Sequence, residues 1–299
     1  MKKLQLGIAP IGWSNDDLPE LGGDISLDSC LKDMQSIGYA GTELGNKFPT
    51  GGTEIKTLLK SYNLVLASSW HSTFFLQDSF SKERTRLESK LEQLVDAGAK
   101  NINICECTGS VHGIEDKALS TRPRMRAEDW TPFAKNMSEA GKICSDYGIK
   151  LCYHHHMGTV VQSQEEIETL LESTDPEHVF LCFDTGHLSF AGADPLVCWQ
   201  IFSSRVRHVH LKDIRENILK KLMINDWSFL KGVKEGVFTV PGDGGIDFRP
   251  LIHKILDSNY SGWLLVEAEQ DPSKADPYTY AKRAYAFLGH LIEYNSATH

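Results

Sequence analysis

Short runs of β-branched and aliphatic residues alternate along the chain with longer stretches whose apolar residues recur every three or four positions. This alternation predicts strands separated by helices, and therefore a parallel sheet covered by helices. Strands are expected at 6–11, 41–44, 65–69, 101–105, 150–154, 179–184, 206–211 and 263–267. Helices are expected at 83–97, 129–147, 164–173, 249–257 and 277–294. Eight strand–helix units close a barrel, so the 299 residues are expected to form one (β/α)8 TIM barrel domain, residues 1–299.

Local signals support several of these boundaries. Gly98 and Gly148 each come just after an expected helix and just before a strand, where a left-handed residue ends a helix at least cost. Ser163 and Glu166 are spaced as a capping box at the start of the helix expected at 164–173. No linker or low-complexity segment divides the chain, which favours a single domain.

Two long connections follow expected strands. One spans residues 108–128 and contains Arg122, Arg124 and Arg126, and the other spans residues 216–236, the least regular part of the chain. Loops that follow barrel strands form the active-site face. We therefore expect residues 216–236 to form an irregular excursion over the mouth of the barrel.

Composition narrows the class of protein. The hydrophobic fraction of 41% and the charged fraction of 24% are typical of a globular protein. The net charge of −9 argues against a nucleic-acid binder, which usually presents a clustered basic face. No apolar run is long enough to cross a membrane, and the first residues lead directly into a strand. Neither a membrane anchor nor a signal peptide is therefore expected.

The seven cysteines lie singly or as the pair Cys105 and Cys107, within expected strands and helices. That distribution favours reduced, buried thiols in a cytoplasmic protein over a disulfide framework. The pair could also belong to a zinc site, but no second pair accompanies it. Reduced thiols are the preferred interpretation.

Polar residues end the last four expected strands. Apolar residues give way to His154 in the fifth strand, Asp184 in the sixth, His210 in the seventh and Glu267 in the eighth. The ends of barrel strands surround one mouth, so these side chains are expected to converge. Two imidazoles and two carboxylates suit a divalent transition metal better than Mg²⁺, and the carboxylates neutralise its charge. The pattern predicts these four residues as metal ligands.

Each residue also has a structural interpretation when it is taken alone. Asp184 could cap the following helix, His210 could be hydrogen-bonded in the core, and Glu267 could belong to an ion pair. The metal interpretation is favoured because the groups end four successive strands. Strand alternation turns His155 toward the helices and places His208 one layer deeper than His210, so both are expected to be structural.

The segment Asp184-Thr185-Gly186-His187 resembles a signature of the xylose-isomerase-like barrel superfamily of sugar isomerases, epimerases, dehydratases and type IV apurinic endonucleases. A histidine after strand seven, here His210, and the glycine-rich loop 242–248 are similar to the same pattern. The resemblance implies a (β/α)8 barrel with a divalent metal. Most relatives carry Glu where this chain has His154, so this ligand departs from the pattern.

That departure belongs to a narrower resemblance. The runs His-His-His-Met-Gly-Thr at 154–159 and Val-Glu-Ala-Glu-Gln-Asp-Pro at 266–272, with the stretches 7–17 and 41–45, look like the inosose dehydratases of myo-inositol catabolism. The resemblance implies loss of water from 2-keto-myo-inositol (scyllo-inosose), a small polyol ketone, to give a trihydroxycyclohexane-1,2-dione. Mn²⁺ or Co²⁺ is the favoured cofactor, with Zn²⁺ as an alternative. Assistance by glutathione and assembly into a homo-oligomer are left open.

Such a reaction needs proton transfer beside the metal. A metal bound to the ketone and an adjacent hydroxyl would act as a Lewis acid, and the departing hydroxyl needs a proton donor. His156 and Glu269 lie one layer outward from His154 and Glu267 on the same strand faces, and His187 lies three residues beyond Asp184. His156, Glu269 and His187 are the predicted acid–base residues, and a structural role for His187 is equally open.

Other strand ends are expected to contribute substrate contacts. Glu43 and His71 end the second and third strands and Lys212 follows the seventh, so each could bind hydroxyl groups of the substrate ring. Trp13 and Trp70 could form an apolar wall, although a buried tryptophan more often belongs to the core.

Three other functions compete with the dehydratase. A sugar or inosose isomerase or epimerase would use the same metal but return the proton to the substrate. An endonuclease would need a basic surface, which a net charge of −9 does not favour. A metal-binding interaction protein would not need so many convergent acid, base and ligand candidates. Product analysis separates the first alternative from the dehydratase.

Overall fold

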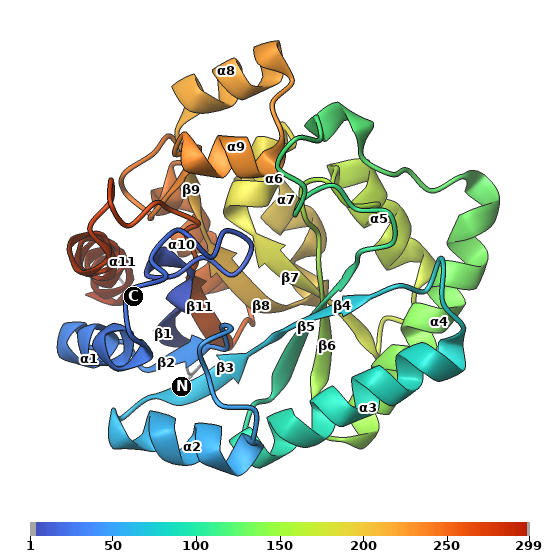
Figure 1. Cartoon of the computed structure of the whole chain (residues 1–299), viewed down its shortest axis with the longest axis horizontal. Coiled ribbons are helices and arrows are strands. Elements are labelled where there is room, and N and C mark those ends of the chain that lie inside the picture. Colours follow the sequence, from blue (N-terminus) through green and yellow to red (C-terminus); the bar gives the residue numbers. More distant parts are fainter. Residues whose placement is uncertain (1–3, 298–299) are drawn as a thin grey trace.

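A single sheet of nine parallel strands forms the centre of the molecule, and helices surround it (Figure 1). The computed structural model describes residues 4–297. The strand order is β3-β2-β1-β11-β8-β7-β6-β5-β4. The strands are β1 Leu4–Ile8, β2 Gly41–Glu43, β3 Val65–Ser68, β4 Trp70–Thr73, β5 Asn101–Glu106, β6 Lys150–His154, β7 Val179–Asp184, β8 Val206–Leu211 and β11 Gly262–Val266. A short antiparallel pair, β9 Asp213–Ile214 and β10 Phe238–Thr239, follows β8.

The two end strands of this sheet are consecutive in the chain. β3 ends at Ser68 and β4 begins at Trp70, so the two strands are halves of the third barrel strand, interrupted at Ser69. The Ser69 carbonyl accepts a hydrogen bond from the backbone N of Asn103 in β5 at 2.9 Å. The ring of eight strand positions therefore closes, as expected for a TIM barrel.

The helices cover the outside of the barrel with one apolar face each. In α3 the buried aliphatic residues Leu87, Leu91 and Leu94 recur at helical spacing. The helices are α1 Leu27–Ile37, α2 Gly52–Ser61, α3 Phe80–Ala97, α4 Ala127–Asp146, α5 Gln164–Ser173, α6 Thr185–Phe190, α7 Pro195–Phe202, α8 Glu216–Asn225, α9 Phe229–Lys234, α10 Phe248–Asp257 and α11 Pro277–Ala297. Short 3-10 turns occur at Pro10–Gly12, Leu119–Thr121 and Ser203–Arg205.

The predicted helix boundaries are confirmed where capping chemistry defined them. Gly98 and Gly148 have φ angles of 89° and 70°, in the left-handed region that glycine adopts most easily. The Ser163 hydroxyl accepts a hydrogen bond from the backbone N of Glu166, and the Glu166 carboxylate accepts one from the backbone N of Ser163. These contacts are the predicted capping box at the start of α5.

Two predicted segments are wrong in detail. The first strand ends at Ile8 instead of continuing to residue 11, because a 3-10 turn begins at Pro10, which has no backbone N–H to donate to a neighbouring strand. Residues 216–236 are regular and form α8 and α9. Leu222 is the one buried residue of α8 and contacts Gly232 of α9, so α8 gives only a weak periodic signal.

The cysteines and helices agree with the expectations from composition. All seven cysteines are buried free thiols, as predicted. Neither Cys105 nor Cys107 joins a group of potential metal ligands within residues 4–297. In the same part of the chain, no helix combines the length and apolar character that crossing a membrane requires.

Candidate active site

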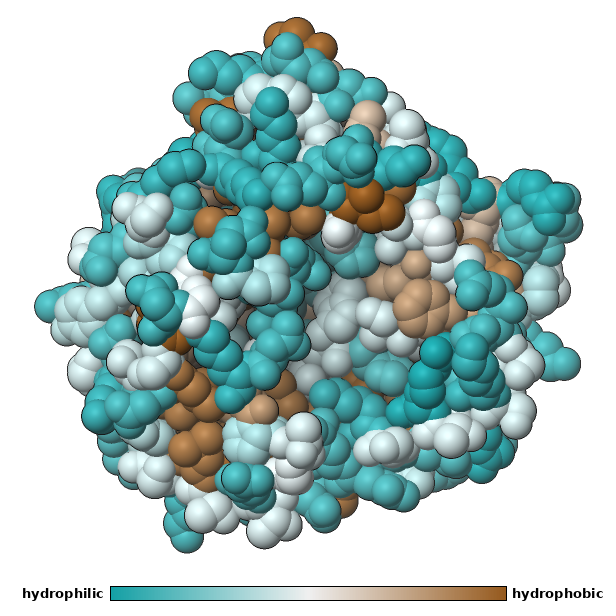
Figure 2. All heavy atoms as spheres, viewed as in Figure 1, coloured by the Kyte–Doolittle hydropathy of each residue, from teal (hydrophilic) through white to brown (hydrophobic). Residues whose placement is uncertain are grey.

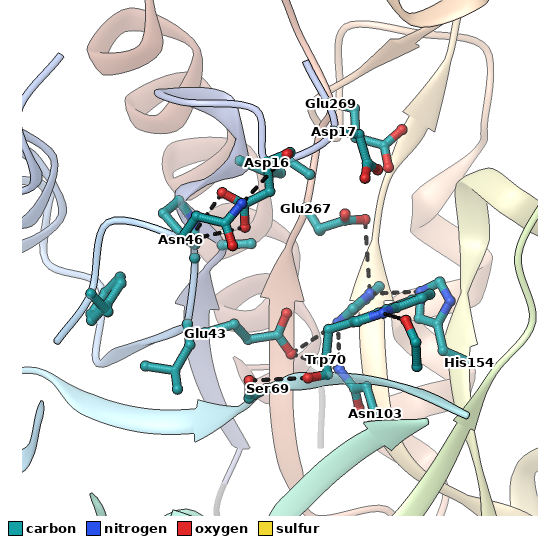
Figure 3. A pocket seen from close by; sticks show the side chains of 18 of the residues that line it. Asp16, Asp17, Glu43, Asn46, Ser69, Trp70, Asn103, His154, Glu267 and Glu269 are labelled. Carbon is teal, nitrogen blue, oxygen red and sulfur yellow. Dashed lines mark hydrogen bonds and ion pairs between the residues drawn. The ribbon is translucent and has the colours of Figure 1, made fainter. Parts of the chain in front are cut away.

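A cavity of about 530 Å³ opens at the mouth of the barrel, where the parallel strands end. Figure 2 shows it as a hollow near the centre of the visible face, and Figure 3 shows the side chains of its wall. The wall combines strand ends with loop residues from both halves of the chain. Its polar and aromatic residues include Asp16, Asp17, Glu43, Asn46, Trp70, Lys90, Asn103, His112, His154, His156, His210, Glu267 and Glu269.

The predicted metal ligands form one cluster at the base of this cavity. His154 Nε2 and His210 Nδ1 each lie 3.5 Å from Asp184 Oδ2. Glu267 Oε2 lies 3.8 Å from His210 Nδ1, and the two imidazole nitrogens are 3.2 Å apart. Strand register explains this convergence, because Asp184 pairs with His210 between β7 and β8, and Glu267 directly follows β11. The structure therefore brings all four residues together.

Asp184 shows that the cluster fits a cation. Its Oδ1 accepts a hydrogen bond from the backbone N of His187 at 2.9 Å, so this oxygen caps α6. Its Oδ2 is buried and has no hydrogen-bond partner within residues 4–297. A buried carboxylate oxygen without a partner is costly. Two imidazole nitrogens and a second carboxylate beside it complete a donor set suited to a divalent transition metal.

Glu43 lies beneath this cluster and orients His210. Glu43 Oε1 lies 3.1 Å from His210 Nε2 and 2.8 Å from His208 Nε2, and the Asn103 amide donates to the same oxygen at 2.8 Å. An ionised carboxylate only accepts, so both Nε2 atoms carry protons, and Nδ1 is the His210 nitrogen that faces the cluster. Carboxylates orient metal-binding histidines in this way. Glu43 also lines the cavity, so its predicted substrate contact stays a prediction, while its Oε1 contacts the two histidines.

Electrostatics keep Glu43 and Asp184 ionised. Burial opposes ionisation of Glu43, but the neighbouring imidazoles of His210 and His208 hold its pKa well below the usual range. Burial also opposes ionisation of Asp184, and Lys212 and His187 outweigh it and keep the pKa low. Both carboxylates are therefore negative at neutral pH.

Lys212 lies behind the cluster and does not line the cavity. Its side chain is fully buried. Its Nζ lies 2.6 Å from Glu267 Oε2, 3.4 Å from Glu269 Oε1 and 3.8 Å from Asp184 Oδ2. Although burial disfavours the ammonium, these carboxylates raise its pKa. The structure thus places Lys212 as an internal counter-charge, away from the position that the predicted substrate contact requires.

His156 and Glu269 face each other across the upper wall of the cavity. His156 Nε2 lies 3.9 Å from Glu269 Oε1. His156 Nδ1 lies 2.8 Å from the Met157 carbonyl oxygen, which can only accept, so Nδ1 carries the proton and Nε2 has a free lone pair. Burial raises the pKa of Glu269, partly opposed by Lys212, and burial lowers the pKa of His156. His156, a neutral base, therefore lies beside Glu269, whose carboxyl group retains its proton more easily than an exposed glutamate.

His187 is buried behind His156 instead of lining the cavity. Its Nε2 lies 3.2 Å from Lys212 Nζ, and its ring packs 4.1 Å from the His156 ring and against Phe229 of α9. Burial lowers its pKa, and Lys212 lowers it further. This position matches the structural alternative, in which His187 supports a neighbouring residue.

Two predicted residues occupy other places. Trp70 and Ser72 line the cavity, whereas His71, between them on β4, does not. Burial lowers the pKa of His71 to about 4, and Lys90 and Arg86 of α3 add to the effect, so the ring lies on the helix side of the strand. Trp13 is buried and donates to Asp33 at 2.9 Å, so it belongs to the core. Trp70 forms the aromatic wall, 5.3 Å from the His154 ring.

The cavity also contains residues that the sequence did not single out. Asp17, in the loop after β1, lies beside Glu269 in the upper part of the cavity (Figure 3). His112, in the loop after β5, packs 5.0 Å from the His156 ring, and burial lowers its pKa to about 4. The Asn103 side-chain amide donates a hydrogen bond to Glu43 at the base of the cavity. Asp17 and His112 lie in loops that follow barrel strands, which places them near the mouth of the barrel. Many other loop residues have the same position, so the sequence does not single these two out.

Comparisons with known proteins agree with this fold. The family model of the xylose isomerase-like TIM barrel matches residues 31–289. The solved structure described as "IOLI protein with a binding zinc atom" superimposes with a TM-score of 0.69 at 14% identity, covering 98% of each chain. The chain therefore belongs to the family of xylose isomerase-like TIM barrels.

Curated relatives narrow this assignment. An inosose dehydratase of Mesomycoplasma hyopneumoniae (strain 7448) is 46% identical over 295 residues, 98% of each chain. An inosose dehydratase of Clostridium tetani (strain Massachusetts / E88) is 42% identical over 287 residues, 96% of each chain. Within the barrel family, the chain groups with the inosose dehydratases over nearly its whole length.

Proposed function

We propose that this chain is a hydro-lyase that removes water from 2-keto-myo-inositol to give a trihydroxycyclohexane-1,2-dione in inositol catabolism. The observation that carries the proposal is the coincidence of full-length similarity to inosose dehydratases with the cluster of His154, Asp184, His210 and Glu267. The cavity of about 530 Å³ is in the size range of small-molecule sites and accommodates a cyclic polyol ketone.

His154, Asp184, His210 and Glu267 would hold a divalent metal, with Mn²⁺ or Co²⁺ favoured and Zn²⁺ as the alternative. When bound, such a metal supplies a Lewis acid for the ketone oxygen and stabilises negative charge that develops there. Glu43 keeps His210 in the tautomer that presents Nδ1. Lys212 balances the carboxylates, so the cluster is not held together by the metal alone.

His156 and Glu269 are the proposed proton-transfer pair. His156 Nε2 removes the proton next to the ketone, because its lone pair faces the cavity. Glu269, protonated, donates to the departing hydroxyl, so that the C–O bond breaks and water leaves. The enol then tautomerises to the dione. The proton on His156 returns to Glu269, 3.9 Å away, and resets the pair.

Wall residues would position the substrate. Asp17 and Trp70 both line the cavity, Asp17 beside Glu269 and Trp70 beside His154 (Figure 3). Asp17 can accept hydrogen bonds from ring hydroxyls, and Trp70 can pack against the apolar face of the ring. His187 acts through His156 and Lys212 instead of touching the substrate.

Turnover of 2-keto-myo-inositol by chelator-stripped protein tests the proposal. Dione absorbance should be near zero before metal addition and should return with Mn²⁺, Co²⁺ or Zn²⁺. Parallel assays with and without glutathione show whether a thiol assists. Conversion of inosose into an isomer without water loss would establish the epimerase alternative, and activity indifferent to added metal would contradict the assigned site.

A further inference from the structure

A second cavity, away from the barrel mouth, lies between α7, α8 and α10. It encloses about 540 Å³ and is lined by apolar residues, including Pro195, Leu196, Leu219, Ile246 and Leu251. We call it the α8 groove. It does not include any residue of the proposed active site.

Exposed apolar side chains gather on the helices that wall this groove. Eight large hydrophobic residues within the described part of the chain are exposed, and four of them lie on α7 and α8. These four are Val197 at 45%, Ile201 at 48%, Met223 at 61% and Ile224 at 83% exposure. Figure 2 shows apolar atoms at the upper tip of the molecule, where Figure 1 places α8. Grouped exposure of this kind marks interaction surfaces.

Few tertiary contacts within the chain stabilise helix α8. Leu222 is its only buried residue, and a ten-residue helix has little stability without tertiary packing. Asp226, in the left-handed conformation at its C-terminus, accepts hydrogen bonds from the backbone and side chain of Ser120. The helix is thus fixed at its end; Ile218 and Leu219 are partly buried against the core, while Met223 and Ile224 are exposed.

The charges around the groove match those of α8. Asp194 and Asp247, at the N-termini of α7 and α10, and Glu216 of α8 lie around the apolar floor. α8 carries Lys220 and Lys221 beside Met223 and Ile224. The groove lining contains three carboxylates and one cation, Lys220, so a second copy of α8 offers apolar side chains together with further positive charge, even though two copies of a chain with net charge −9 repel each other overall.

We propose that two copies of this chain form a dimer in which each α8 packs into the α8 groove of the other. Because α8 also forms one wall of the groove, a twofold axis near Leu219 and Lys220 pairs the two helices in antiparallel orientation. Met223 and Ile224 of one copy then lie against the Glu216 end of the other. The same surface serves both copies, so the contact is closed and stops at two chains.

Sedimentation velocity of the full-length protein over a range of concentrations tests the dimer. Wild type should sediment as a dimer, and Ile224→Glu should raise the dissociation constant at least about tenfold, because it removes a buried aliphatic chain and adds charge near acidic groups. Val95→Glu is the matched control, since Val95 is 45% exposed on α3, and it should leave the dimer intact. A monomeric wild type, or a dimer that Ile224→Glu leaves unchanged, overturns the proposal.

A cysteine cross-link tests the orientation. All seven native cysteines are buried, so background reaction is low. Lys220→Cys, close to the proposed axis, should give a disulfide-linked dimer under mild oxidation with oxidised glutathione. Ser89→Cys, exposed on α3, should not. Equal cross-linking of both variants, or none with Lys220→Cys in a dimeric protein, overturns the antiparallel arrangement.

Discussion

The strands of the second half of the chain and those of the first half contribute to the same cavity in different ways. β6, β7, β8 and β11 end in His154, Asp184, His210 and Glu267, whose polar atoms lie within 4 Å of one another in a chain of contacts. The first half contributes residues that surround or orient this cluster, such as Glu43 beneath it.

The two kinds of contribution differ in how easily a residue can be exchanged. A ligand must hold one atom at one position, so its side chain is fixed by the strand end from which it projects. A wall residue such as Asp17 only has to face the substrate, and many loop conformations allow that. We therefore expect changes at the four ligands to abolish metal binding, and changes at wall residues such as Asp17 to alter affinity or rate while metal remains bound.

The largest expected effect comes from Asp184→Asn. Asparagine retains the helix-capping oxygen that accepts from the backbone of His187, so α6 should persist. The variant loses the negative charge and one metal-binding oxygen. Metal retained after dialysis should fall to background, and kcat should drop about a thousandfold, as several kcal/mol of transition-state stabilisation is lost. Metal analysis and steady-state kinetics measure both; full metal retention would remove Asp184 from the ligand set.

Glu43→Gln should have the next largest effect. Glu43 lies in the first half of the chain and contacts His210, a predicted ligand from the second half. Gln can still accept from His210 and His208, but without the charge that holds their protons on Nε2. Metal affinity should weaken about 10- to 100-fold, as for other residues that orient a metal-binding histidine. A titration with Co²⁺, followed by its absorption spectrum, measures the change. An unchanged affinity together with a raised KM would restore Glu43 as a substrate contact.

The sequence predicted the barrel and the convergence of the four polar strand ends because both depend on strand position. Register alone brings Asp184 opposite His210, and the four polar strand ends were visible as breaks in apolar runs. The depth of a side chain was less predictable. Lys212 shares a strand face with His210, yet it is buried behind the cluster because Glu267, Glu269 and Asp184 surround its ammonium. Those long-range contacts have no local signal.

Loop contributions were the least predictable. Asp17 and His112 reach the cavity through irregular segments, where no periodicity relates sequence position to direction. For His71 the difficulty was the interruption of the third strand at Ser69. After this break Trp70 and Ser72 face the cavity, and His71 faces α3. A shift of one residue along the strand therefore decides which side chain enters the site.

Asp17→Asn should show the smaller effect that we expect of a wall residue. Metal content should remain that of wild type, while kcat/KM for 2-keto-myo-inositol falls about tenfold, because a hydrogen bond to a charged acceptor becomes a neutral one. Asp24→Asn, an exposed position in the same loop, is the matched control and should behave as wild type. Loss of metal from Asp17→Asn would contradict the distinction between metal ligands and wall residues.

His71→Gln should have the smallest effect on catalysis and a distinct effect on stability. The pKa of His71 is about 4 in the folded chain because of burial, against about 6.5 when exposed. Between these values the unfolded chain binds more protons, so wild type loses stability as pH falls from 6.5 to 4. The variant should lose less, by on the order of 2 kcal/mol at pH 4. Urea unfolding at several pH values measures this difference. Parallel pH curves for the two proteins, or a large fall in kcat at neutral pH, would return His71 to the cavity and place a third-strand residue among the groups that contact substrate.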